Sequence, residues 1–86
     1  MRFRLSRHAE EEMARRQIPR PWLESVLENP EQRVPESGGK EILQSRFESG
    51  DGKIYLVRAV VSRDKEPAVV VTVYRTSKVE KYWRPE

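Results

Sequence analysis

The sequence contains no cysteine, which excludes disulfides, thiolate nucleophiles and cysteine-bound zinc. Long apolar runs are also missing: even Ala68 to Val71 is far shorter than the roughly 20 residues that a membrane-spanning helix needs. The two aspartates, Asp51 and Asp64, fall in predicted turns, so a carboxylate metal cluster is not expected. Glycine-rich phosphate loops and a serine-hydrolase elbow are absent as well. We expect a cytoplasmic domain with no cofactor and no membrane partner.

The positive charge of the chain is concentrated in its C-terminal part. The net charge is +3, from 17 basic and 14 acidic side chains; residues 1–52 sum to −1 and residues 53–86 to +4. Twelve of the basic residues are arginine, whose planar guanidinium matches phosphate geometry. This distribution favours an anionic partner such as RNA. A charged surface with no such partner is the alternative.

The length of 86 residues predicts one domain, residues 1–86, with one modest core. Helical spacing marks residues 7–16, with Ser6 as the N-cap, and residues 21–28, which place Trp22, Leu23, Val26 and Leu27 on the buried face. Beyond Pro30 the period changes to two, and strands are expected at 41–48, 53–61 and 68–76. Residues 33–34 form a candidate edge strand, Arg2 to Leu5 an opening strand or extended arm, and 77–86 a polar tail.

This order of elements predicts an α+β domain in which two N-terminal helices pack on one face of a three- to four-stranded antiparallel sheet. Residues 41–76 are expected to form its continuous three-stranded meander. The other face of the sheet should be partly open and should present polar side chains to a ligand.

His8 is the only histidine, and imidazole is the side chain that titrates nearest neutral pH without perturbation. In the first turn of a helix it would stay neutral and could act as a general base. A partly buried histidine bonded to a backbone carbonyl is the structural alternative.

Arg58 interrupts an apolar strand that should be central, on the same strand face as Leu56 and Val60. A buried guanidinium needs a partner or a cleft. It could pair with Glu12 or Glu24, or it could bind an anion at the floor of a site.

Further candidate ligands of an anion follow on the last strand. Tyr74 and Thr76 share one strand face, Arg75 lies opposite, and Lys78 follows the strand end. These groups could hold a phosphate or form the ordinary solvent side of a strand. Tyr82-Trp83 could stack on a base or dock onto the core.

The opening of the chain resembles the signature of a family of small bacterial domains of unknown function, Ser-x-His-Ala-x-x-Arg-Met-x-x-Arg-x-Ile. Matching residues are His8, Ala9, Met13, Arg16 and Ile18, with Glu28-Asn29-Pro30 and Thr72-Val73-Tyr74. Glu12 stands where the family has its first arginine. More distantly, in size and order of elements, the chain is similar to RelE/BrnT-type ribonuclease toxins, which implies a RelE/barnase-like two-layer fold and a small antitoxin protein as partner.

Together these residues are compatible with RNA cleavage that needs no metal, which requires a base, an acid and positive charge near the phosphorus. The leading hypothesis is a toxin-like RNA endonuclease, with His8, Arg58 and Tyr74 as catalytic residues. Substrate contacts are then expected from Arg16, Arg75, Thr76 and Lys78. A non-catalytic module that binds protein or RNA is the alternative. The enzyme hypothesis requires His8 to converge with Arg58 and the Tyr74 strand in one cleft.

Overall fold

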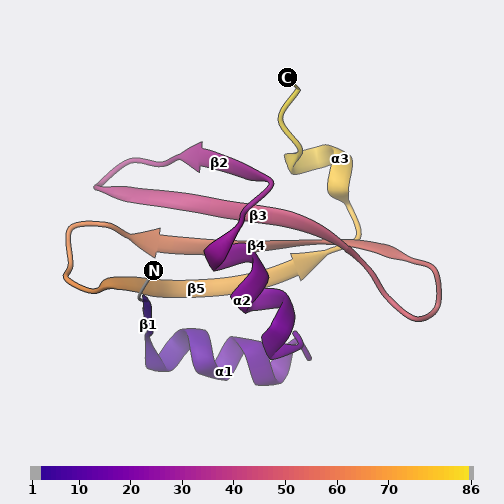
Figure 1. The fold of residues 1–86 in the computed structure, drawn as a ribbon, viewed down its shortest axis with the longest axis horizontal. Helices are drawn as coiled ribbons and strands as arrows, with labels where there is room; N and C mark the ends of the chain where they lie inside the picture. Colours follow the sequence, from indigo (N-terminus) through magenta and orange to yellow (C-terminus); the bar gives the residue numbers. More distant parts are fainter. Residues whose placement is uncertain (1–2, 86) are drawn as a thin grey trace.

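The computed structural model describes residues 3–85 of the chain. Its elements are, in order, β1 (Phe3–Leu5), α1 (Arg7–Arg15), α2 (Arg20–Glu28), β2 (Gln32–Pro35), β3 (Lys40–Glu48), β4 (Ile54–Ser62), β5 (Ala68–Thr76) and α3 (Val79–Tyr82). The predicted α+β class is confirmed. Figure 1 shows α1 along the β5 side of the sheet and α2 crossing it.

The strands of residues 3–85 form one five-stranded sheet in the order β1-β5-β4-β3-β2. The antiparallel meander predicted for residues 41–76 is confirmed, because β3, β4 and β5 are antiparallel neighbours. The predicted number of three to four strands is wrong, since β2 joins β3 and β1 joins β5. A purely antiparallel sheet is also wrong: β1 runs parallel to β5. A three-residue strand has too little pattern to reveal its partner or direction. Arg2, in the predicted opening strand, lies outside the described residues.

Ser6 joins the first helix to the sheet. Its Oγ accepts a hydrogen bond from the Ala9 N–H (3.0 Å), which confirms it as the N-cap of α1, and donates to the carbonyl of Val71 in β5 (2.8 Å). At the other end of α1 the chain reverses at Gln17, whose φ is 54°, and the Ile18 N–H donates to the Met13 carbonyl. The bond from Ser6 to Val71 therefore ties the start of α1 to β5.

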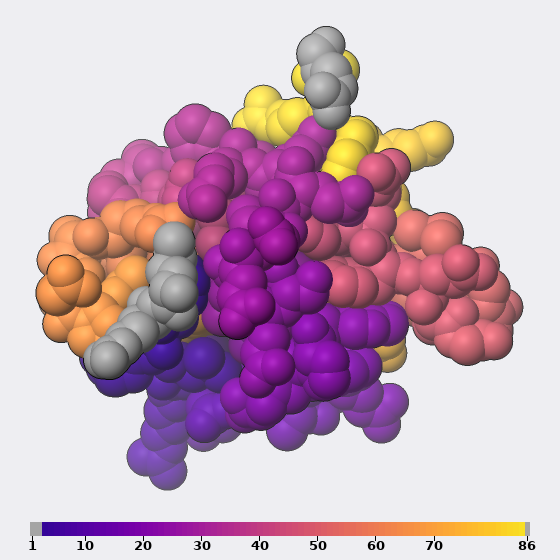
Figure 2. Space-filling model, in the orientation of Figure 1, coloured from indigo at the N-terminus to yellow at the C-terminus, as the bar shows by residue number. Residues whose placement is uncertain are grey.

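The core lies between the helices and one face of the sheet, here called the helix face. Its fully or nearly fully buried residues include Ala9, Met13, Leu23, Val26, Leu27, Leu43, Val57, Ala59, Val61, Val70 and Val73. Trp22, predicted to be buried with them, is only half-buried and stacks on Phe47, with ring centroids 4.9 Å apart. Figure 2 shows α2 covering the centre of this face, with the turn between β3 and β4 projecting at one end.

The predicted polar tail contains a helical turn, α3, in which no residue is buried. Glu86, the last residue of the predicted tail, lies outside the described residues. No helix within residues 3–85 has the length and apolar character to cross a bilayer.

Candidate functional site

Arg58 lies in the centre of the sheet and points away from the two large helices. Its neighbours Val57 and Ala59 belong to the helix-face core, so strand alternation directs Arg58 to the opposite face. The side chain is 7% exposed. Its Nε donates to Gln44 Oε1 (2.7 Å) and its Nη1 to the Tyr74 hydroxyl (2.6 Å). Both partners stand directly opposite Arg58 in the neighbouring strands.

Aromatic rings complete the surroundings of this guanidinium. Its central carbon lies 4.3 Å from the centroid of the Tyr82 ring and 5.7 Å from that of Tyr74. The two rings meet edge to face. Among residues 3–85 no carboxylate forms an ion pair with Arg58. The alternative of an ion pair with Glu12 or Glu24 is therefore wrong, and the partners that the described residues offer this cation are neutral dipoles and ring faces.

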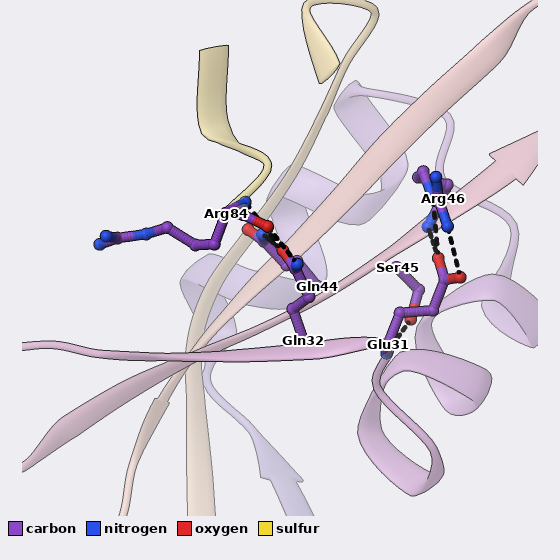
Figure 3. A network of polar contacts seen from close by, with 6 residues as sticks. All are labelled: Glu31, Gln32, Gln44, Ser45, Arg46 and Arg84. Carbon is purple, nitrogen blue, oxygen red and sulfur yellow. Dashed lines mark hydrogen bonds and ion pairs between the residues drawn. The ribbon is translucent and has the colours of Figure 1, made fainter. Parts of the chain in front are cut away.

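Residues 79–85, called here the C-terminal strap, are held over this network by two glutamines (Figure 3). Because Gln44 Oε1 accepts from Arg58, its Nε2 faces the strap and donates to Gln32 Oε1 (2.8 Å) and to the Tyr82 carbonyl (3.3 Å). Gln32 in turn donates to the Arg84 carbonyl (2.7 Å) and accepts from the Arg84 N–H (3.1 Å). The face of the sheet under the strap is called the strap face below.

A groove of about 520 Å³ lies beside α3, at the end of the sheet where β4 begins and β5 ends. Its lining residues are Arg46, Ile54, Ser77, Lys78, Val79, Glu80 and Lys81. Lys78 and Lys81 are exposed, and neither forms an ion pair within residues 3–85. The Thr76 hydroxyl accepts from the Lys78 N–H (3.0 Å) and fixes the turn between β5 and α3. The groove thus presents cations next to the rings of the strap.

Glu31 closes the edge of β3 where β2 does not reach. Its carboxylate accepts from the backbone N–H of Arg46 (2.7 Å), and its own N–H donates to Ser45 Oγ (3.0 Å) (Figure 3). The Arg46 guanidinium donates to the same carboxylate, which lowers the pKa of Glu31, and lies 4.0 Å from the Trp83 ring centroid. Glu31 therefore positions Arg46 between the edge of the sheet and the strap.

Four of the predicted site residues lie together on the strap side. Arg58 and Tyr74 are in direct contact, Thr76 follows Tyr74 by two residues on the same strand, and Lys78 lines the groove. Sequence reasoning missed Gln44 and Gln32, because an isolated strand glutamine looks like part of a solvated surface. The register counted back from the turn at residues 50–52 could have placed Gln44 opposite Arg58.

The other three predicted site residues lie on the helix side. His8 is exposed on α1, whose buried residues Ala9 and Met13 pack in the helix-face core, so His8 does not share a cleft with Arg58. Arg75 pairs in register with the core residue Val57, and its guanidinium lies 4.6 Å from the Tyr55 ring centroid.

Arg16 is the last of these three, and it is engaged by Glu12. Arg16 Nε donates to the Glu12 carboxylate (2.7 Å), as do Nε and Nη2 of Arg15 (3.0 and 2.7 Å). These bonds, those from Arg15 first, lower the pKa of Glu12 from 4.5 to about 2. Glu12 thus gathers two arginines onto α1.

The comparisons with known proteins identify a family. A family model described as "Domain of unknown function (DUF4258)" matches residues 5–75, so the chain belongs to that family. No curated protein and no solved structure matches the chain. Within the described residues, no three histidine, aspartate or glutamate side chains gather closely enough to hold a metal ion.

Proposed function

We propose that this member of the DUF4258 family binds single-stranded RNA along its strap face. The observation that carries the proposal is the groove beside α3, which is lined by Lys78 and in which Arg46 and Lys81 lie next to aromatic rings. Proteins that bind single strands combine a positively charged groove, which follows the phosphates, with rings on which bases stack.

The rings of this face suit that role. Tyr82 and Trp83 are half-buried, so part of each ring is accessible, and each lies next to a cation: Lys81 at 5.4 Å from the Tyr82 centroid and Arg46 over Trp83. Stacking of one base on such a ring contributes about 1–3 kcal/mol. Phosphate attraction adds a term that depends on salt rather than sequence.

Fluorescence anisotropy of a labelled single-stranded RNA, measured over a series of salt concentrations, tests this proposal. Replacing Lys78 and Lys81 by glutamine should weaken binding and reduce the log–log salt slope by roughly 0.7 for each lost phosphate contact. The matched control is Lys65→Gln, in the exposed turn at the opposite end of β4, which should leave binding unchanged. Binding that is independent of salt, or no binding at low salt, would favour the protein-interaction module.

A second candidate function, cleavage of the bound RNA, is favoured by the bond between Arg58 and Tyr74. Because the Tyr74 oxygen accepts from Arg58, its own hydrogen remains to be donated, and a phenol in that position could protonate a leaving 5′-oxygen. Arg58 and Lys78 would stabilise the charge that develops as the 2′-oxygen attacks phosphorus, while the proton of the 2′-hydroxyl passes to water and the bond from phosphorus to the 5′-oxygen breaks. This is the kind of reaction implied by the distant similarity to RelE/BrnT-type toxins, and an antitoxin-like protein would then be expected to cover the strap face.

Cleavage is tested by incubating labelled RNA with the protein in the presence of a metal chelator. Tyr74→Phe, which keeps the ring and removes the proton donor, should slow cleavage by a factor on the order of 10² or more. His8→Gln should leave the rate unchanged, because His8 is exposed on α1. The opposite result, loss with His8→Gln and full activity with Tyr74→Phe, would restore His8 as the acid or base and remove Tyr74.

A further inference from the structure

We propose that Arg58 is a phosphate-binding subsite which the C-terminal strap closes, so that a phosphate group reaches the guanidinium only when residues 79–85 move off the sheet. The inference rests on the proposed function and deepens it: the groove beside α3 would bind RNA first, and displacement of the strap would admit one phosphate to Arg58.

The first argument is the missing counter-ion. Burial of a guanidinium is costly unless a negative charge and full hydrogen bonding compensate for the lost water. Arg58 is 7% exposed, yet its partners among residues 3–85 are a neutral amide, a neutral phenol and two ring faces. A phosphate would supply the negative charge that the site lacks, and its oxygens match the fork of a guanidinium.

The second argument is that the site persists when the strap leaves. The bonds from Arg58 to Gln44 and Tyr74 lie within the sheet and involve no strap residue. Removal of Tyr82 would uncover one side of the guanidinium while these two bonds hold its orientation. A donor that is already oriented loses little conformational freedom on binding, which favours affinity.

The third argument is that the strap is lightly attached. No residue of α3 is buried, and Tyr82 and Trp83 are only half-buried. Within residues 3–85, its hydrogen bonds to the strands of the sheet are those with the side-chain amides of Gln32 and Gln44. Segments with few buried apolar contacts open at the lowest free energies in a folded protein. Opening the strap therefore leaves the helix-face core intact.

Titration of the full chain with inorganic phosphate, followed through the NMR signal of the Arg58 Nε–H group, tests the inference. Two variants loosen the strap: Tyr82→Ala removes the ring over Arg58, and Gln32→Ala removes both bonds to Arg84. Each should tighten phosphate binding on the order of tenfold, because the open state becomes more populated. Tyr82→Phe keeps the ring and is the matched control, with the affinity of the unaltered chain. Adding Arg58→Gln to the Tyr82→Ala variant should abolish the binding.

Two results would overturn the inference: equal phosphate affinity in the unaltered chain and both strap variants, or binding that survives Arg58→Gln in the Tyr82→Ala background. Should Tyr82→Ala fail to fold, Gln32→Ala alone decides, since it truncates a half-buried amide and leaves both bonds of Arg58 within the sheet in place. If RNA binding depends on Lys78 and Lys81 but phosphate never reaches Arg58, this inference fails and the proposed function stands. If phosphate binds Arg58 as described but RNA does not bind at low salt, the subsite is supported and the proposed function fails.

Discussion

The two faces of the sheet are covered through different kinds of interaction. The helix face is closed by α1 and α2 through apolar contacts, with Leu23 and Val57 almost fully buried. The strap face also buries apolar side chains, Leu56 and Ile42, but its centre is the cation of Arg58. There the cover is a short segment attached through amides and rings. The first face therefore provides most of the stability of the fold, and the second is the face that, in our proposal, exchanges its cover for a ligand.

The largest expected difference between the faces is in the free energy of unfolding. Leu23→Ala should cost about 2–5 kcal/mol, because it leaves a cavity in the helix-face core. Tyr82→Ala should cost at most about 1–2 kcal/mol, since it removes a half-buried ring and its cation–π contacts with Arg58 and Lys81. Urea denaturation followed by circular dichroism measures both. Equal losses would show that the strap belongs to the same cooperative unit as the core.

A smaller effect is expected when Arg58 becomes methionine. This change loses two hydrogen bonds but also removes a buried charge without a counter-ion, so the two effects should nearly cancel and leave a loss of about 1 kcal/mol or less. Thermal melting and RNA binding should be measured on the same sample. RNA binding should weaken while the melting temperature barely changes. A large loss of stability would make Arg58 a structural residue instead.

The smallest effect is expected from Glu12, a buried residue of α1 whose carboxylate pairs with two more exposed arginines. Its pKa is lowered to about 2 by the bonds from Arg15 and Arg16, so its contribution to stability is complete above pH 4.5 and is lost as the pH falls towards 2. Glu12→Gln should lower the urea midpoint at pH 6 and flatten its decline between pH 4.5 and 2. Glu24→Gln, at an exposed position of α2, is the control. An unchanged slope in Glu12→Gln would contradict the pairing.

Local pattern was sufficient for most elements of the fold. The predicted helices and main strands agree with the observed bounds to within about one residue, because apolar spacing and turn residues act over short stretches. For β1 the pattern predicted an opening strand or extended arm but not its parallel pairing with the free edge of β5. Pattern was insufficient for α3, whose sequence Val79-Glu80-Lys81-Tyr82 has no apolar stripe. Both depend on contacts with residues far away in the chain.

The candidate site was predicted in part for the same reason. Arg58 was recognisable because a charge in an apolar strand is unusual, and Tyr74 because it alternates with apolar neighbours. To separate His8, Arg16 and Arg75 from these two residues would have required knowing which face of the sheet each element covers. The sequence does not encode that locally. Gln32 and Gln44 acquire their importance only from the strap, and the strap is held by contacts between residues 38 and 52 positions apart in the sequence.

The position of Glu31 has a consequence for self-association. β3 continues past the end of β2, and an uncovered strand edge with free N–H groups invites pairing with another copy of the chain. The Glu31 carboxylate occupies the Arg46 N–H, which a foreign strand would otherwise bind, and places a negative charge beside it. Because its pKa is lowered, this protection extends to more acidic solutions than an ordinary glutamate would allow. Intermolecular sheet growth from this edge is thus opposed by a single ionised side chain.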